Sequence, residues 1–328
     1  MKKNPVEQIA QKIQKCQRIV ITSHLRPDGD SICTALALYQ MGKSLGKEMS
    51  IINHDPTPFP FNLFPDVENI TIGQIPPDEF DLVILLECAN IGRSGHKYIK
   101  DYYKINIDHH HSNDYYGDIN WVDPDAAAVG CLVYFLGEEL KVKFTPRISN
   151  HLYCAIVSDT GSFQFSNTSP QSFLVSYNLT KKGASPILVS ERLFSNNSPE
   201  KIKLLGLVLS TLQMNNDGKI AMITMFKKHL NMLNLKEIDT EDITTLARSI
   251  KGVKIVLFLK EMEEDVFRVS IRSKESVNSA QIAEYFNGGG HMHAAGFTAK
   301  GPYESLIKTL PEKVSLLLKS DPKNTEDH

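Results

Sequence analysis

The feature that most constrains the fold is a set of short apolar segments that end directly in acidic or imidazole side chains. Segments 18–22, 82–86 and 104–107 are rich in Ile, Leu and Val, which is typical of strands buried on both faces. Helical patterns alternate with these segments, and this alternation favours a largely parallel sheet with helices on both faces. We therefore predict an α/β domain whose polar side chains collect at one edge of the sheet.

The pattern changes after a stretch rich in Ser, Asn and Pro at 183–199. Asn216-Asp217-Gly218 predicts a hairpin, and segments 254–260 and 266–272 predict an antiparallel pair of strands. The second half is therefore expected to be a smaller α+β domain. The predicted boundaries are 1–185 for the first domain, 186–212 for a linker with a helix, 213–319 for the second domain and 320–328 for a disordered tail.

Composition excludes several classes of protein. The 328 residues suffice for about two domains, and 36 basic against 38 acidic residues provide no track for gripping long nucleic acid. The five cysteines are odd in number, widely spaced and without a C-x-x-C pair, which favours a reducing cytosol over a disulfide framework. No apolar run is long enough to span a membrane or form an export signal. We expect a soluble, cytoplasmic protein.

Carboxylate and imidazole side chains follow successive predicted strands, and a further carboxylate follows the apolar run 148–157. In open α/β sheets, ligands bind at the carboxyl ends of the strands. Carboxylates mixed with imidazoles suit manganese, magnesium or zinc. The candidate residues are His24, Asp28, Asp30, Glu87, Asp108, His109 and Asp159.

Charge balance indicates how many ions such a site would hold. Four ionised carboxylates in one cleft are uncompensated unless two divalent cations balance them, and one cation leaves a surplus of two negative charges. Any single residue of the set has an ordinary explanation as a turn or a helix cap, but their joint placement favours a metal site. Such a pair of ions polarises a phosphoryl oxygen and generates a hydroxide nucleophile near neutral pH. These carboxylates are Asp28, Asp30, Glu87 and Asp159.

Four motifs resemble those of the DHH phosphoesterase superfamily. They stand at 24–30 (His-Leu-Arg-Pro-Asp-Gly-Asp), at 82–87, at Asp108-His109-His110 and at 157–163. Downstream, segments 268–274 and 288–296 resemble the DHHA1 module, so the resemblance implies an active site in the cleft between the two domains. It covers nearly the whole chain and is strongest to the NrnA-like group of nanoRNases and phosphoadenosine phosphate phosphatases.

The resemblance also implies roles for individual residues around two divalent cations, with Mn²⁺ preferred. It assigns one ion to His24, Asp28 and Glu87, and the other to Asp30, Glu87, His109 and Asp159. By the same resemblance His110 faces the substrate phosphate, Asp108 orients the histidines, and Arg93 steadies the reacting phosphate. The family usually has Asp where this chain has Glu87, and the extra methylene bears on metal preference and turnover.

In the second domain, Gly288-Gly289-Gly290 can present consecutive backbone N–H groups as an anion-binding nest, although a flexible turn is the alternative. An arginine offers a planar fork for two phosphate oxygens, and a histidine donates a further hydrogen bond. Trp121 and Phe163 could stack on a base, but such residues more often pack in a core. The expected substrate-binding residues are Arg272, Ser273, Gly289, Gly290 and His291.

These features predict a two-metal phosphohydrolase that acts on short oligoribonucleotides and on 3'-phosphoadenosine 5'-phosphate (pAp), releasing nucleoside monophosphates. Long DNA and membranes are not expected partners. The sequence leaves open whether the chain forms a homodimer. Two alternatives also stay open: a cyclic di-AMP or pApA phosphodiesterase, and a catalytically silent nucleotide-binding regulator. The Gly-His module argues against an inorganic pyrophosphatase.

Overall fold

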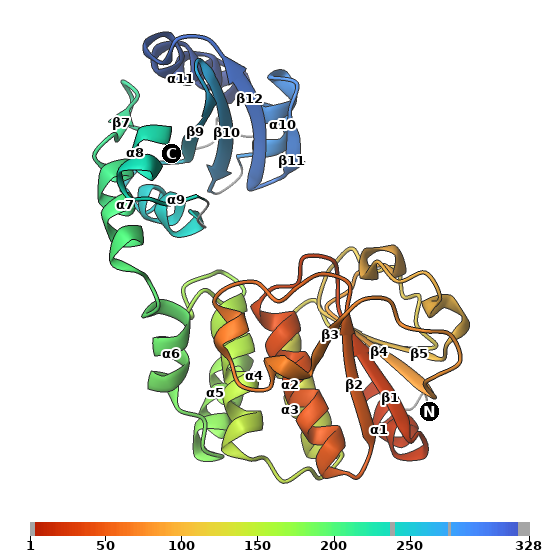
Figure 1. Cartoon of the computed structure of the whole chain (residues 1–328). Coiled ribbons are helices and arrows are strands. Elements are labelled where there is room, and N and C mark those ends of the chain that lie inside the picture. The colour runs from red at the N-terminus through yellow and green to blue at the C-terminus, as the bar shows by residue number, and fades with distance from the viewer. Residues whose placement is uncertain (1–3, 237–239, 275–276, 321–328) are drawn as a thin grey trace. The chain divides into compact units, whose positions relative to one another are not determined.

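The computed structural model describes residues 4–236, 240–274 and 277–320, and the chain divides into two compact units, Met1–Asn196 and Asn197–His328 (Figure 1). The predicted linker, 186–212, holds two helices that belong to different units. Helix α6 (Pro186–Phe194) packs Val189 in the first unit, and α7 (Pro199–Leu209) packs Leu204 in the second. Of the predicted disordered tail, Ser320 ends a helix and residues 321–328 lie outside the described residues.

The first unit is built on a six-stranded parallel sheet in the order β3-β2-β1-β4-β5-β6. This arrangement confirms the predicted parallel α/β fold, and the three short apolar segments form adjacent strands β1, β4 and β5. The edge strands β3 and β6 carry no long apolar run, and the sequence analysis did not predict them. The strands are β1 (Arg18–Thr22), β2 (Glu48–Asn53), β3 (Ile70–Ile72), β4 (Leu82–Leu86), β5 (Lys104–Asp108) and β6 (Ile119–Val122).

Successive side chains of each central strand pack into cores on opposite faces of the sheet. In β1, Ile19 and Ile21 join the larger core, whereas Val20 joins a smaller one. The larger core is covered by α-helices, which Figure 1 shows beside the sheet. On the other face the cover includes the 3₁₀ helix η4 (Ile99–Asp101). The α-helices are α1 (Pro5–Lys15), α2 (Gly29–Ser44), α3 (Val129–Glu139), α4 (Pro146–Asp159) and α5 (Pro170–Lys181).

The second unit is built on a mixed sheet in the order β11-β12-β10-β9-β8-β7. The predicted hairpin joins β7 to β8, and the predicted antiparallel pair is β9 and β10, whereas β8 and β9 run parallel. Helices α10 and α11 cover one face, and α7 and α9 cover the other. Its elements are β7 (Gln213–Met214), β8 (Ile220–Met225), α8 (Lys227–Met232), α9 (Glu241–Arg248), β9 (Ile255–Glu263), β10 (Val266–Ser273), α10 (Ser279–Tyr285), β11 (Gly289–His291), β12 (Ala294–Lys300) and α11 (Tyr303–Ser320).

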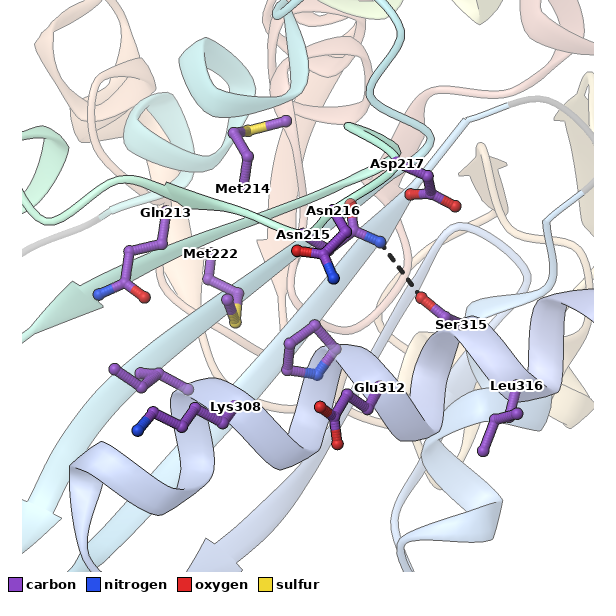
Figure 2. A pocket seen from close by; sticks show the side chains of 12 residues that line it. Gln213, Met214, Asn215, Asn216, Asp217, Met222, Lys308, Glu312, Ser315 and Leu316 are labelled. Carbon is purple, nitrogen blue, oxygen red and sulfur yellow. Dashed lines mark hydrogen bonds between the residues drawn. The ribbon is translucent and has the colours of Figure 1, made fainter.

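A groove of about 520 Å³ lies between the β7–β8 hairpin and α11 (Figure 2). Met214, Met222 and Pro311 are among the residues that line it, and Asn215 donates a hydrogen bond to Ser315 across it at 3.2 Å. None of the predicted site residues lines this groove. Among the described helices, none combines the length and apolar character needed to cross a bilayer.

Helix α3 packs so closely on α4 that Gly130 leaves no space for a side chain. A Cβ at Gly130 would lie 2.7 Å from the Cβ of Ala155, so we expect Gly130→Ala to destabilise the chain by about 1–3 kcal/mol through overpacking. Gly206 in α7 has nothing within 4 Å of the same position, so Gly206→Ala should stabilise by up to about 1 kcal/mol. Urea unfolding measures the free energy of unfolding of both variants. Equal changes in that free energy would contradict the packing argument.

Candidate metal centre

The acidic and imidazole side chains of the first unit meet where β1, β4 and β5 end. His24 follows β1, Glu87 follows β4 and His109 follows β5, while Asp159 ends α4. Because these strands are parallel neighbours, their carboxyl ends lie at one edge of the sheet. Residues from four separate parts of the sequence therefore come together at a single place.

Three sets of residues there have potential ligand atoms within 4.8 Å of one another. Two of them correspond to the two ligand sets that the resemblance implies, apart from the sharing of Glu87. The third joins Glu87 and His109 to His110, which the resemblance places toward the substrate. The sets are His24, Asp28 and Glu87; Asp30, His109 and Asp159; and Glu87, His109 and His110.

Glu87 lies at the centre of the cluster. Its two carboxylate oxygens lie 3.8 Å from Nε2 of His24 and 3.8 Å from Nε2 of His109. These separations are too long for hydrogen bonds, but they suit two ligands of a shared ion. Glu87 is only 3% exposed, and its Oε2 has no hydrogen-bond partner. A buried carboxylate oxygen without a partner is costly, and a cation would satisfy it.

The backbone at Glu87 is also unusual. Its φ of +55° places it in the left-handed region, which costs a residue with a Cβ about 1–3 kcal/mol. Such conformations cluster at functional sites. Glu87 directly follows the last residue of β4, and its side chain lies between the two histidines.

Both predicted ligand histidines present Nε2 to the cluster because their other ring nitrogen is engaged. Nδ1 of His24 donates to the carbonyl oxygen of Leu25 at 2.8 Å, and Nδ1 of His109 donates to that of Ala126 at 3.0 Å. A carbonyl oxygen can only accept, so the proton is held on Nδ1. Nε2 is therefore the ring atom that a metal ion would bind.

Asp28 and Asp30 are placed by the start of α2. Asp28 caps the helix, and its side chain accepts from the backbone of Ser31 in a reciprocal capping box. Asp30 lies in the first turn of the helix and is almost fully buried. Its Oδ2 accepts from the backbone N–H of Val129 at 2.5 Å, and its Oδ1 accepts from that of Gly130 at 3.0 Å. The carboxylate therefore also anchors the start of α3.

The carboxylates disfavour one another's charge. Burial, followed by the nearby Asp28 and Asp30, raises the pKa of Glu87 well above its usual range. Burial raises the pKa of Asp30 to about 6, and burial with the neighbouring Asp30 raises the pKa of Asp159 to about 7. Burial works against a charged His109, but Glu87, Asp30 and Asp159 outweigh it and raise its pKa to about 10. The cluster attracts positive charge strongly.

Asp108 does not face this cluster but organises the residues next to it. It is fully buried, and its Oδ1 accepts from the backbone N–H of His109 at 2.8 Å and lies 2.7 Å from Nδ1 of His110. Burial raises the pKa of Asp108, but hydrogen bonds from His110 and Asn113 outweigh burial and lower it. An ionised Asp108 keeps the proton on Nδ1 of His110, so the opposite side of that ring can accept a proton.

Two asparagines that the sequence analysis did not identify support the site. Asn113 donates to Asp108 at 2.5 Å and to Asn106 at 2.8 Å. Asn167 donates to the carbonyl oxygens of Ala127 and Asp159, both at 3.0 Å. Their amides lie five and eight residues after the acidic residues that they support, a spacing with no periodic signal. Only their contacts identify them.

The remaining predicted residue of the first unit, Arg93, lies in the 3₁₀ helix η3 (Ile91–Ser94) and is exposed. Its carbonyl oxygen accepts from the backbone N–H of Leu25 at 2.6 Å, which links η3 to the segment that carries His24. The guanidinium lies near enough to Cys88 to oppose the rise of that thiol's pKa. Arg93 therefore lies in the segment that follows Glu87, beside the segment that carries His24.

The predicted phosphate-binding residues of the second unit lie around the end of β10. Arg272 pairs with Ala294, which also pairs with His291, so the three lie in one row across the sheet. The structure describes the backbone of His291 but not its side chain. Ser273, also predicted to bind substrate, has its hydroxyl engaged within the unit. It is buried, and its hydroxyl donates to the carbonyl oxygen of Val277 at 2.7 Å, so it supports the local fold.

The glycine triplet also differs from a free loop. Gly289 and Gly290 belong to edge strand β11, which pairs with β12. A Cβ at Gly288 would lie 2.2 Å from the carbonyl oxygen of Gly296, and a Cβ at Gly290 would lie 2.4 Å from Cα of Ala295. Two of the three glycines are therefore required by close packing against β12. Gly289 has nothing within 4 Å of its Cβ position, so it is the one that borders open space.

Comparison of the sequence with known proteins identifies related families. A model of the DHH family N-terminal domain matches residues 18–156, and a model of the DHHA1 domain matches residues 219–320. The chain is 33% identical over 304 residues to the bifunctional oligoribonuclease and PAP phosphatase NrnA of Thermus thermophilus, and the match covers 90% of each chain.

Two solved structures have a similar fold. An exopolyphosphatase-related protein from Bacteroides fragilis superposes with a TM-score of 0.83 at 24% identity, covering 95% of this chain and 96% of the other. RecJ from Thermus thermophilus in complex with Mn²⁺ superposes with a TM-score of 0.51 at 14% identity, covering 98% of this chain and 56% of that one.

Divalent cations should stabilise the folded protein, because they bind the clustered carboxylates only when the fold brings these together. At an Mn²⁺ concentration roughly 100-fold above Kd we expect a gain of about 2.7 kcal/mol, measured as a rise in Tm. Glu87→Gln should lose most of this rise, whereas Asp101→Asn, an exposed acid before the amino end of β5, should keep it. An unchanged rise in Glu87→Gln would contradict the assignment.

Proposed function

The chain belongs to the DHH family of phosphoesterases that carry a DHHA1 domain, and from this membership we propose that it hydrolyses short oligoribonucleotides to nucleoside monophosphates and pAp to AMP. As a family member it is a phosphoric ester hydrolase that acts on nucleotides. The observation that carries the finer proposal is the buried cluster around Glu87, together with the name of the Thermus relative. Both point to metal-assisted cleavage of a small nucleotide.

The residues present fit two divalent cations, for which Mn²⁺ is our proposal. The fit rests on the unpartnered oxygen of Glu87, on the imidazoles that turn Nε2 toward it, and on four carboxylates that share one region. His24, Asp28 and Glu87 would hold one ion, and Asp30, Glu87, His109 and Asp159 the other. When bound, such ions polarise a phosphoryl group and lower the pKa of bound water toward neutrality.

The chain's own residues then position the reacting groups. Glu87 lies between His24 and His109, so one carboxylate can serve both ligand sets. The hydrogen bonds to Leu25 and Ala126 hold these rings in the orientation that binding needs. His110, held by Asp108 and about one third exposed, can take up a proton on its other ring nitrogen and then donate a hydrogen bond to a phosphate oxygen. Arg93 is proposed to steady the same phosphate.

The second unit is proposed to bind a phosphate of the substrate other than the reacting one, through Arg272, Gly289, Gly290 and His291. A planar guanidinium and the edge of a strand can both contact phosphate oxygens. The near-neutral net charge of −2 suits substrates of a few nucleotides rather than long DNA. All five cysteines are free and buried, which suits a reducing cytoplasm.

The two open alternatives are distinguished by substrate. An assay of metal-stripped protein with added Mn²⁺ on pAp, dinucleotide RNA, cyclic di-AMP and pyrophosphate should show turnover of pAp and the dinucleotide. Preference for cyclic di-AMP would favour a cyclic-dinucleotide phosphodiesterase. Nucleotide binding without any hydrolysis would instead favour a silent regulator.

His109→Ala should abolish turnover of every substrate, because this ring joins Glu87 and Asp159 in one ligand set. The loss should be at least about 1000-fold, as expected when the electrostatic stabilisation of a transition state is removed. His111→Ala is the matched control, since His111 is exposed and belongs to none of the potential metal sets. Near-normal rates for His109→Ala would show that the metal assignment is wrong.

Arg272→Ala should act differently, since Arg272 is proposed to hold the substrate rather than the metal. We expect KM for pAp and the dinucleotide to rise about tenfold, as for the loss of a charge-assisted hydrogen bond, with kcat less affected. The Mn²⁺-induced rise in Tm should stay intact. Steady-state kinetics measures the split, and an unchanged KM would remove Arg272 from the binding site.

A further inference from the structure

A strained turn directly follows the predicted metal ligand Asp159. Gly161, Ser162 and Phe163 have successive φ angles of +53°, +60° and +64°, so three residues in a row lie in the left-handed region. Glycine adopts this region freely, but a bulky residue such as Phe163 does so only when its surroundings impose it. Such an outlier next to a reaction centre suggests a functional role for the segment.

The surroundings do hold this turn firmly. The backbone N–H of Ser162 donates to the carbonyl oxygen of Val157 at 2.8 Å, and that of Phe163 donates to the hydroxyl of Thr160 at 3.1 Å. The ring of Phe163 stacks on Phe173 of α5, with centroids 5.0 Å apart and planes 17° apart. Phe163, which the sequence analysis considered for base stacking, therefore has one face occupied.

Phe165 is placed differently, because its ring lies against a glycine and is half exposed. A Cβ at Gly161 would lie 2.4 Å from the ring, so the side chain rests on the glycine backbone. The residue nevertheless remains 50% exposed. An aromatic ring supported from one side and open to solvent on the other is the arrangement on which a nucleobase can stack.

Both ends of the segment that carries Phe165 are tied to the metal centre. It starts at Asp159 and ends at Asn167, whose side-chain amide donates to the carbonyl oxygen of Asp159 at 3.0 Å. Phe165 lies two residues before Asn167, a span of at most about 7 Å along the chain. The backbone that carries the open ring therefore lies close to Asn167, the residue whose side chain holds the carbonyl oxygen of Asp159.

We propose that Phe165 is a stacking platform for a nucleobase of the substrate and that it favours nucleotides over inorganic phosphates. This inference rests on the proposed function, and it adds a specificity-determining residue outside the predicted metal and phosphate contacts. Stacking on a π face tolerates any base, so the platform explains how one site accepts oligoribonucleotides of different sequence. It offers nothing to pyrophosphate, which has no base.

The test uses the full chain with Mn²⁺ and three substrates: the dinucleotide pApA and its two abasic counterparts, each of which lacks one base. For the wild type, KM should rise about tenfold when the stacked base is missing, a typical loss for one stacked base. Phe165→Leu keeps an apolar side chain without a π face. This variant should raise KM for pApA about tenfold. It should leave KM unchanged for the abasic substrate that lacks the stacked base.

Two control variants separate stacking from structural damage. Phe165→Tyr keeps the π face and should retain the wild-type KM. Tyr103→Leu removes an exposed aromatic ring before β5, at the opposite edge of the sheet, and should have no effect. If Phe165→Leu merely displaced Asp159, turnover would fall equally on all three substrates and the Mn²⁺-induced rise in Tm would shrink.

The outcomes are distinguishable. The platform is supported if KM for pApA and KM for the abasic substrate become equal in Phe165→Leu and differ again in Phe165→Tyr. If the difference in KM persists in Phe165→Leu, the stacking proposal is overturned, whether or not turnover falls. Absence of hydrolysis by the wild type overturns the proposed function and this inference with it, whereas hydrolysis with an unchanged KM in Phe165→Leu overturns the inference alone.

Discussion

The first unit depends on how its fold manages mutually repelling carboxylates. Burial and neighbouring negative charge raise the pKa of Glu87, Asp30 and Asp159 together, and the same groups raise that of His109. A buried cluster of this kind is unfavourable unless positive charge enters it. The fold nevertheless builds the cluster into rigid elements, with backbone hydrogen bonds to Asp30 and a left-handed residue at Glu87. Stability is lost locally in a cluster that is able to bind a cation, as expected for a functional centre.

The parallel sheet explains why this is possible. Its carboxyl edge brings the ends of β1, β4 and β5 side by side, and each end contributes a ligand type without disturbing the apolar strand before it. The start of α2 adds Asp28 and Asp30, and the end of α4 adds Asp159. Hydrogen-bond partners then set the orientation of each group: Leu25 and Ala126 for the imidazoles, and Asn113 for Asp108. This division between ligands and their supports is typical of metal centres.

The family relationship connects this site to nucleotides, and the details of the chain suggest how specificity arises. Glu87 lies within 3.8 Å of both histidines although its backbone is in the left-handed region. The segment after Asp159 then carries aromatic rings instead of charges, and Phe165 leaves a face open. In the second unit, close packing of Gly288 and Gly290 on β12 accounts for two glycines that resembled a phosphate loop.

By itself, the sequence determined the candidate ligand types, the strands that carry them and the parallel α/β class. These follow from local patterns: apolar runs form strands, and the residue after a strand lies at its carboxyl edge. Sequence patterns did not reveal the short edge strands β3 and β6 or the supporting roles of Asn113 and Asn167. The tertiary structure alone decided that Asp30 binds the start of α3 and that Ser273 is buried. Many of these partners are backbone N–H and carbonyl groups. Because nearly every residue carries both, residue type does not predict which of them will be partners in the folded chain.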